Sequence, residues 1–385
     1  MKYEVHIPST LLIGEGTRKE TGSLAAKLGM KSVLLVSDKY LETIGLVSEF
    51  SDILKASGIN PVVFTDIDSE PEIGNVLDAM KVIGANKCDG IVSIGGGSSI
   101  DTAKAVSILV TNGGDMSDYM GVGKVPKAGL PHIAVPTTAG TGSEATRVTI
   151  ITNKETSVKM MCLDDAFLPI AAIVDYELSM TMPKNLTSYV GIDALTHAIE
   201  AYVSQKANPV SDIFAKKAIE LIGRNILTAY NSPSDAAARS AMMEGSTFAG
   251  IAFSNASVCA VHGMSRPIGA HFHVAHGLSN AMLLPIVTEY SIVGNPARYA
   301  EIAGFMGLAG KSEKDLTDAL VRKLHEFNKL MQVPSPAVFG IDKDHYMRVL
   351  SDMADAAINS GSPGNNPKLF TKEEIIDLYK KVYGS

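Results

Sequence analysis

The sequence contains little cysteine, few aromatic residues and no long apolar run, and each shortage excludes a class of protein. Its 385 residues include three cysteines, no tryptophan and 6% aromatic side chains, which argues against a large stacking pocket for a substrate. Three scattered thiols are too few for a disulfide framework or a cysteine-based zinc site, so we expect a reducing compartment. No stretch reaches the roughly 18 uninterrupted apolar residues of a membrane span, and the N-terminus has no signal-peptide pattern. We therefore expect a cytoplasmic protein without a membrane partner.

Positive charge is also scarce. The chain has 34 Lys and Arg residues against 41 Asp and Glu residues, which gives a formal net charge of −7. Such a chain lacks the basic surface that binds a phosphate backbone, so we do not expect a nucleic-acid partner. Hydrophobic residues make up 46% of the sequence, enough to bury a large core, and this excludes intrinsic disorder. The length predicts two domains, or at most three.

The two halves of the chain differ in pattern. The first half alternates short apolar runs with amphipathic helical segments, which predicts a parallel sheet covered on both faces and ligands at the carboxyl ends of its strands. From about residue 183 onward, every remaining segment has helical periodicity. We therefore predict an α/β fold with a Rossmann-like parallel-sheet domain at 1–183, followed by an all-helical domain at 184–385. The expected strands are Val33–Ser37, Pro61–Thr65, Ile91–Ile94, His132–Pro136 and Ala172–Val174.

Two loops that follow strands in the first half suit a dinucleotide. The glycine turn, Gly95–Ser98, lets the backbone approach a ligand closely and opens a helix whose free N–H groups favour an anion. It is not a G-x-G-x-x-G motif, and on its own it is equally typical of an ordinary tight turn. The threonine loop, Pro136–Glu144, offers hydroxyl groups after another strand. Asp38 ends an earlier strand, where a carboxylate accepts ribose hydroxyls, although a helix N-cap is the alternative role. Together these features predict a dinucleotide site.

Histidines gather in the second half, where five of the nine fall between residues 197 and 276. Asp193 and His197 are four residues apart on a predicted helix, so both side chains lie on one face. His262 and His276 are separated by glycines and a proline, which we expect to break or redirect the chain. Each histidine alone is more often a packing residue. One carboxylate and three imidazoles together suit a divalent ion such as Fe²⁺, Zn²⁺, Mn²⁺ or Co²⁺, and the ligand types do not choose among them.

Four motifs together make this sequence resemble the iron-containing (group III) alcohol dehydrogenases over essentially its whole length. They are GGGSSIDTAK, PTTAGTGSEAT, GIDALTHAIEAY and HGMSRPIGAHFHVAHGLSNAMLLP. The resemblance implies a dehydroquinate synthase-like fold, a homodimer or larger homo-oligomer, NAD as cofactor, and Fe²⁺ as metal, with Zn²⁺ or Mn²⁺ as alternatives. It implies metal ligation by Asp193, His197, His262 and His276, and NAD contacts at Asp38, Gly96, Gly97, Ser98, Thr138, Thr141 and Lys159.

Two of these residues bear on the choice of metal and of dinucleotide. Zinc-dependent relatives use a three-ligand site, so His197 resembles the additional ligand of the iron branch. Asp38 favours NAD over NADP, because a carboxylate repels a 2′-phosphate.

One position departs from the family pattern. Many relatives carry a second histidine four residues after the ligand that corresponds to His262, where it is suspected of proton transfer, and this chain has Arg266 there. A guanidinium does not release a proton near neutral pH. We expect either a chain of water and ribose hydroxyls or His273 to relay the proton, while helix packing is the alternative role for His271 and His273. Arg266 itself could pair with a carboxylate or sulfonate on the substrate, or simply tie helices together.

The sequence thus predicts reversible hydride transfer between NAD(H) and a small primary alcohol or aldehyde, with the metal as a Lewis acid. The expected catalytic residues are His262, Arg266 and His273. Three alternatives stay open: a zinc-dependent polyol dehydrogenase of the glycerol type, a dehydroquinate synthase-like lyase, and a non-catalytic metal- or nucleotide-binding module. The lyase is expected to carry more lysine and arginine around its metal than this chain shows.

Overall fold

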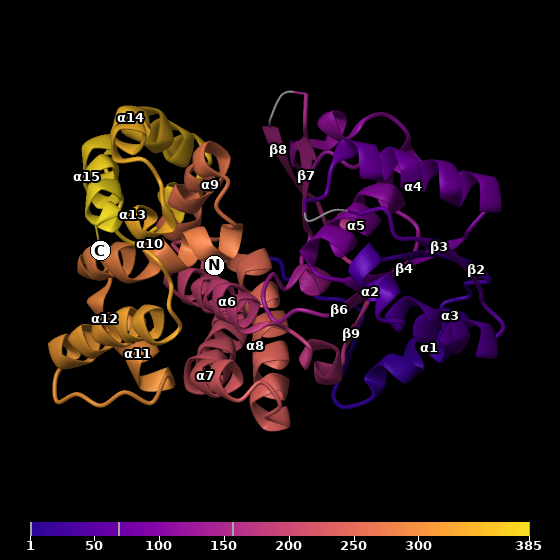
Figure 1. Cartoon of the computed structure of the whole chain (residues 1–385), viewed down its shortest axis with the longest axis horizontal. Helices are drawn as coiled ribbons and strands as arrows, with labels where there is room; N and C mark the ends of the chain where they lie inside the picture. The colour runs from indigo at the N-terminus through magenta and orange to yellow at the C-terminus, as the bar shows by residue number, and fades with distance from the viewer. Residues whose placement is uncertain (1, 68–69, 156–157, 385) are drawn as a thin grey trace. The chain divides into compact units, whose positions relative to one another are not determined.

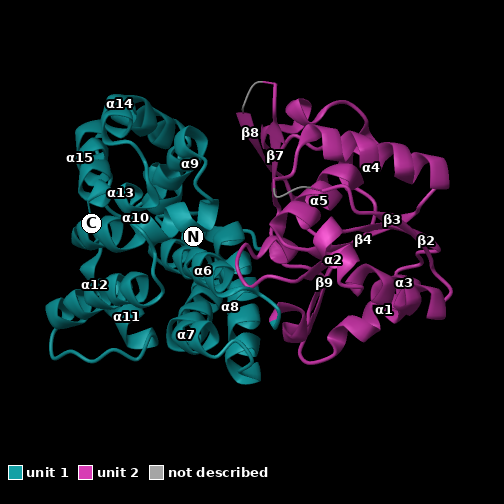
Figure 2. Ribbon diagram, viewed as in Figure 1, with its two compact units in different colours: residues 1–5, 180–385 teal, residues 6–179 magenta. Residues whose placement is uncertain are grey.

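The computed structural model describes residues 2–67, 70–155 and 158–384 and divides into two compact units (Figures 1 and 2). One unit is residues 6–179, and the other combines residues 1–5 with 180–385. The predicted domain limits, 1–183 and 184–385, differ from these units by four residues at the boundary and by the first five residues of the chain.

The unit of residues 6–179 is built on a six-stranded parallel sheet in the order β1-β9-β6-β4-β2-β3. The central strands consist almost entirely of buried residues, as expected for a parallel sheet with both faces covered. The prediction missed β1, a short edge strand that is only partly buried. The strands are β1 (Thr10–Ile13), β2 (Ser32–Val36), β3 (Asn60–Phe64), β4 (Gly90–Gly95), β6 (His132–Pro136) and β9 (Ala171–Val174).

Helices cover both faces of this sheet. In β2, Leu34 and Val36 join the core on one side with α4 and α5, while Val33 and Leu35 join the core on the other side with α1 and α3. This alternation follows from the two-residue period of a strand. The predicted α/β class is therefore confirmed. The helices are α1 (Thr21–Lys27), α2 (Lys39–Thr43), α3 (Leu46–Ala56), α4 (Ile73–Asn86) and α5 (Gly97–Asn112).

A second, smaller sheet in the same unit was not predicted. Strands β7 (Val148–Asn153) and β8 (Val158–Leu163) pair antiparallel, and β5 (Gly121–Val122) adds to β8 in parallel. Figure 1 shows β7 and β8 side by side. Lys159 therefore lies on a strand of this smaller sheet.

The unit containing residues 180–385 has only helices and turns in its described residues, as predicted. Helix α6 has five consecutive buried residues, Ala194–Ala198, so it is buried all round, and α7 and α8 pack against it. Pro209 and Pro296 begin helices after Asn caps, and Thr371 forms a capping box with Glu374. The helices are α6 (Lys184–Val203), α7 (Pro209–Asn231), α8 (Ala236–Ala256), α9 (Ala260–Phe272), α10 (His276–Ser291), α11 (Pro296–Phe305), α12 (Glu313–Leu330), α13 (Pro336–Phe339), α14 (Lys343–Asn359) and α15 (Lys372–Tyr383).

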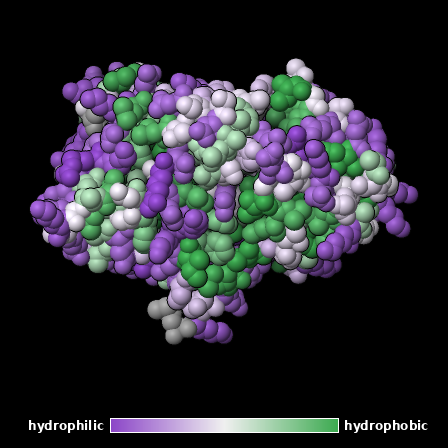
Figure 3. All heavy atoms as spheres, turned by 90° about the horizontal axis from the view of Figure 1, so that it is seen from below, coloured by the Kyte–Doolittle hydropathy of each residue, from purple (hydrophilic) through white to green (hydrophobic). Residues whose placement is uncertain are grey.

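Apolar side chains also reach the surface. Figure 3 shows apolar patches among hydrophilic residues on one face of the molecule, and Ile213, Val293 and Val338 are strongly exposed. Across residues 2–67, 70–155 and 158–384, no helix combines the length and apolarity needed to cross a bilayer.

Candidate metal centre and dinucleotide site

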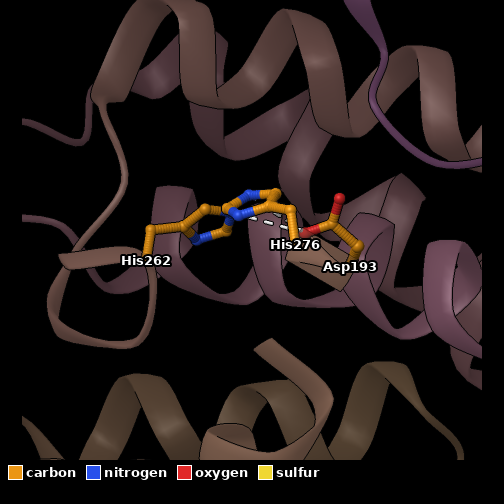
Figure 4. Close-up of side chains that lie close together, drawn as sticks. All are labelled: Asp193, His262 and His276. Carbon is orange, nitrogen blue, oxygen red and sulfur yellow. Dashed lines mark ion pairs between the residues drawn. The ribbon is translucent and has the colours of Figure 1, made fainter. Parts of the chain in front are cut away.

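Asp193, His262 and His276 come together in the helical unit, and we call them the Asp–His cluster (Figure 4). Each residue offers one ligand atom, and these atoms all lie within 4.8 Å of one another. His262 Nε2 lies 3.5 Å and His276 Nε2 lies 3.9 Å from Asp193 Oδ1. Asp193 and His262 are buried, whereas the His276 side chain is 44% exposed. The cluster is therefore anchored in the core and has one exposed member.

Three helices position the cluster. Asp193 lies in the middle of α6, His262 in the first turn of α9, and His276 is the first residue of α10. Gly277 allows α10 to approach α6, because a Cβ there would lie 2.7 Å from the Tyr189 carbonyl oxygen.

The expectation that glycine and proline break the chain between His262 and His276 was largely wrong. A single helix, α9, continues through Gly263, Pro267 and Gly269 and ends where His273 adopts a left-handed conformation with φ of 54°. Gly263 serves packing, because a Cβ there would lie 2.6 Å from Pro363 Cδ. The chain instead changes direction at residues 273–275, between the end of α9 and the beginning of α10.

His197 lies beside the cluster but is not one of its three members. Its ring stacks on Phe253 and on His262, with centroids 4.3 Å and 4.4 Å apart. The predicted four-ligand set is thus gathered in one place, with three members converging on one point and the fourth stacked on the ring of His262.

Asn280, which the sequence analysis did not single out, occupies the space between the three ligand atoms. Its Nδ2 donates to Asp193 Oδ1 at 2.6 Å and lies 3.2 Å from both His262 Nε2 and His276 Nε2. An amide has two N–H hydrogens for these three acceptors. Its buried Oδ1 has no hydrogen-bond partner among the described residues. A divalent cation would attract all three acceptors at once, so the donor set fits a metal.

The electrostatics of the cluster favour an ionised Asp193. Burial by itself raises the pKa of this carboxyl, but the charges of His197 and His276 and the hydrogen bond with His262 outweigh burial and lower the pKa. Burial lowers the pKa of His262, yet its hydrogen bonds to Asp193 and Glu200 raise the pKa overall. The carboxylate therefore carries its charge at neutral pH, as a metal ligand requires.

The other two catalytic candidates lie on or next to α9. Arg266 is four residues, about one turn, after His262 and is half-buried, and burial lowers the pKa of its guanidinium. In the part of the chain that the structure describes, Arg266 forms no ion pair and no hydrogen bond through its side chain. His273 ends α9 with an exposed side chain, and no described contact joins it to the Asp–His cluster.

The predicted dinucleotide residues lie in the other unit, at the carboxyl ends of β2, β4 and β6. Gly95 pairs with Pro136, and its carbonyl accepts a hydrogen bond from Thr137 N at 3.0 Å, so the glycine turn and the threonine loop start side by side. A Cβ on Gly97 would lie 3.0 Å from Thr141 Cγ2, and one on Gly96 would lie 3.5 Å from Thr138 Oγ1. The two loops form a cradle in which a Cβ on Gly97 would be crowded, whereas one on Gly96 would make an ordinary contact.

The cradle ends at the beginning of α5. Gly96 is the N-cap of α5 and supplies no side chain to its first N–H groups, which suits an anion, and Ser98 lies in the first turn. Asp38 follows β2, and its Oδ2 would lie 3.7 Å from a Cβ on Gly95. Asp38 Oδ1 accepts a hydrogen bond from Leu41 N at 2.9 Å, so this carboxylate also caps α2.

Lys159 stands apart from these residues. It is exposed on β8 and forms an ion pair with Glu70. No described contact joins it to the glycine turn.

A buried charged pair under the threonine loop was also missed. Lys104 Nζ donates to Ser143 Oγ at 2.8 Å and to Thr146 Oγ1 at 3.0 Å, and Ser143 Oγ donates to Asp101 Oδ1 at 2.6 Å. Burial lowers the pKa of Lys104 to about 8. The signal in the sequence was a charged pair three residues apart inside an otherwise uncharged helix. The pair ties the threonine loop to α5.

Comparisons with known proteins agree with this architecture. Residues 8–176 match the model of the iron-containing alcohol dehydrogenases, and residues 187–383 match that of the C-terminal part of the Fe-containing alcohol dehydrogenase family. Alcohol dehydrogenase 4 of Saccharomyces cerevisiae strain YJM789 is 37% identical over 381 residues, which cover 98% of each chain. A 1,3-propanediol oxidoreductase structure has a TM-score of 0.96 at 34% identity, covering 99% of this chain and 100% of its own.

A sulfoacetaldehyde reductase structure from Bifidobacterium kashiwanohense, solved in complex with NAD⁺, has a TM-score of 0.91 at 28% identity, covering 100% of this chain and 100% of its own. These matches extend over nearly the entire sequence. The chain therefore belongs to the iron-containing alcohol dehydrogenase family and is an oxidoreductase.

Proposed function

We propose that this enzyme transfers a hydride reversibly between NAD(H) and a small primary alcohol or aldehyde, with Fe²⁺ held by Asp193, His262, His276 and His197. The observation that carries the proposal is the convergence of three ligand atoms within 4.8 Å of one another in a thiolate-free set. A carboxylate and imidazoles suit Fe²⁺, Zn²⁺ and Mn²⁺ alike. We favour iron because His197 stands beside the other three as the additional ligand of the iron branch of the family.

The cradle of the glycine turn and threonine loop supports NAD as the cofactor. We propose that Gly96, Gly97 and the first N–H groups of α5 bind the pyrophosphate, and that Thr138, Thr141 and Ser98 donate hydroxyl hydrogen bonds. We propose that Asp38 accepts from the ribose and disfavours NADP, and that Lys159 completes the contacts. One structural relative was solved with NAD⁺.

The two sites have different roles in the proposed reaction. When bound, the metal supplies a Lewis acid for the substrate oxygen and NAD supplies or accepts the hydride. Asp193 contributes a negative charge and His262 and His276 contribute lone pairs that together hold a divalent cation. The glycine turn supplies backbone N–H groups that orient the cofactor without a side chain in the way.

The proton that accompanies hydride transfer needs a carrier other than Arg266, whose guanidinium stays protonated. We propose His273, with a chain of water and ribose hydroxyls as the alternative. His273→Asn keeps a residue that tolerates the left-handed conformation at this position. If His273 relays the proton, the variant loses the ionisation near the histidine range from its pH–rate profile, whereas an unchanged profile favours the hydroxyl chain.

Arg266 suggests that the substrate is anionic. Its guanidinium is half-buried, makes no ion pair with the described residues, and lies one turn from His262. Partial burial makes the guanidinium charge costly, and the charge of Glu200 acts on it without a direct ion pair. A carboxylate or sulfonate on a small aldehyde would supply a direct negative partner. A relative of the same fold is a sulfoacetaldehyde reductase.

Kinetics of Arg266→Gln test the anionic substrate. We expect kcat/KM for sulfoacetaldehyde to fall by about 10- to 100-fold, the range of one charge-assisted hydrogen bond, while kcat/KM for propanal changes little. An equal loss for both aldehydes would leave Arg266 a structural residue.

The overall proposal is tested by reconstitution. Metal-free enzyme is loaded separately with Fe²⁺, Zn²⁺ and Mn²⁺, and oxidation of NADH is followed with a series of small aldehydes. We expect turnover only in loaded enzyme and the highest turnover with Fe²⁺. A lyase on the same fold would give no net change in NADH, and a binding module would give no turnover at all.

We also propose that the enzyme works as a homodimer or larger homo-oligomer in the cytoplasm. All three cysteines are buried free thiols, which suits a reducing compartment. Light scattering of the purified protein measures the subunit number, and a monomer would reject the proposed assembly.

A further inference from the structure

Glu200 lies behind the Asp–His cluster and contacts one of its members. It is in α6, is 3% exposed, and its Oε2 lies 2.7 Å from His262 Nδ1. The same carboxylate accepts hydrogen bonds from the backbone N–H groups of Cys259 at 2.9 Å and Val261 at 2.6 Å. Glu200 therefore caps the beginning of α9 from a neighbouring helix, where Cys259 supplies no side-chain cap of its own.

The contact with His262 determines which ring nitrogen is free. An ionised carboxylate only accepts hydrogen bonds, so Nδ1 must carry the hydrogen that lies between His262 and Glu200. Nε2 is then the nitrogen left to bind a cation. It faces the cluster, 3.2 Å from Asn280 Nδ2 and 3.5 Å from Asp193 Oδ1.

Both Glu200 and His262 are buried, so each polar atom of the pair needs a hydrogen-bond partner within the protein. A buried carboxylate needs hydrogen-bond donors, and the two backbone N–H groups supply part of that need at a helix N-terminus. His262 N, 3.4 Å from Oε2, is a third backbone donor, and the imidazole is the fourth. The imidazole contact ties the direction of the His262 ring to α6, the helix that also carries Asp193.

We propose that Glu200 is a positioning residue of the metal centre: it holds His262 in the Nδ1–H tautomer and aims Nε2 at the cation. This inference rests on the proposed function, because it requires that the Asp–His cluster binds a divalent ion. Carboxylates that accept from a metal-bound histidine act in this way in other metal sites, and their loss typically weakens metal affinity by about 10- to 100-fold.

Metal titration of the full chain tests the proposal. Zn²⁺ and, without oxygen, Fe²⁺ are titrated into metal-free wild type, Glu200→Gln and the control Asp235→Asn. Asp235 is also a helix-capping carboxylate, accepting from Ala238 N in α8, but it does not touch the cluster. We expect affinity to fall about 10- to 100-fold in Glu200→Gln and to stay unchanged in Asp235→Asn. Equal affinities in Glu200→Gln and wild type would overturn the proposal.

Urea unfolding of the metal-free proteins separates folding from positioning, because lost capping lowers stability without changing the metal affinity of the folded state. A second measurement does not depend on the variant. Nitrogen-15 spectra of histidine-labelled, metal-free wild type, with His262→Asn for assignment, should show a hydrogen on Nδ1 of His262. An Nδ1 atom without a hydrogen would overturn the role of Glu200 even if Glu200→Gln failed to fold. Wild type that binds no divalent ion would instead overturn the metal site itself.

Discussion

The two sites differ in what they are made of: the dinucleotide cradle is mostly backbone, and the metal centre is mostly side chain. At the cradle, Gly96 and Gly97 contribute N–H groups and the absence of a Cβ. At the metal centre, Asp193, His262 and His276 contribute individual oxygen and nitrogen atoms. The cradle should therefore be broken by adding atoms, and the metal centre by removing them.

The largest expected effect is at the metal centre. His262→Ala removes a metal ligand, so we expect metal affinity to fall by more than about 100-fold and turnover to be lost. The loss should exceed the roughly 10- to 100-fold typical of removing a residue that only hydrogen-bonds to a ligand. Because the cradle is in the other unit, NAD affinity should stay unchanged. The metal content of the purified variant checks the loss of metal binding, and a fluorescence titration with NADH checks the unchanged cofactor affinity. Full activity in metal-free His262→Ala would refute the assignment.

The charged pair beneath the threonine loop, Asp101 and Lys104, makes the packing of the dinucleotide site depend on ionisable side chains. Burial lowers the pKa of Lys104 from 10.5 to about 8 in the folded protein. Between these pH values the unfolded chain binds more protons than the folded one, so the free energy of unfolding rises with pH, by up to about 3 kcal/mol from this residue. Urea unfolding between pH 7.5 and 10.5 should show this rise in wild type and lose it in Lys104→Met. Identical pH profiles would reject the buried titration.

Adding a single methyl group should damage the cradle. Gly95 has φ of 148°, and a Cβ there would lie 2.5 Å from Ser99 Oγ. We expect Gly95→Ala to lose about 2 kcal/mol of stability from backbone strain and to bind NAD more weakly, with metal affinity unchanged.

The matched control is Gly84→Ala in α4, where a Cβ meets nothing within 4 Å and the backbone is helical. That variant should gain about 0.5–1 kcal/mol, because alanine is the better helix former. If Gly95→Ala behaved like Gly84→Ala, the cradle would not depend on glycine.

The smallest expected effect concerns cofactor choice. Asp38→Ser keeps a residue that caps α2 but removes the negative charge that disfavours a 2′-phosphate. We expect the ratio of kcat/KM for NADP to that for NAD to rise by about 10-fold, or about 1.4 kcal/mol. An unchanged ratio would limit Asp38 to its capping role.

The sequence predicted elements whose pattern is local and missed those that depend on partners. Strands β2, β3, β4, β6 and β9 were predicted because each is a short apolar run between helical segments. Strand β8, VKMMCL, has no strong strand preference and is defined by its pairing, whereas β7, VTIITN, is rich in β-branched residues and could have been predicted.

In the candidate sites too, the residues with a local sequence signal were predicted and those that depend on tertiary contacts were not. Asp193 and His262 stand out by type and spacing, whereas Asn280 and Glu200 gain their importance from what lies next to them. The continuous α9 could not be predicted either. Gly263 lowers the helix propensity of this segment. Glycine is needed there because Pro363 packs closely against it, and that tertiary contact is not visible in the sequence.

Anomalous X-ray diffraction from crystals of the Fe²⁺-loaded enzyme, recorded at the iron edge, tests the central claim most directly. We predict one peak per chain, about 2.0–2.2 Å from an Asp193 oxygen and from the Nε2 atoms of His262 and His276. A fully loaded, active enzyme with no peak among these residues, or with its peak elsewhere, would contradict the metal centre described above.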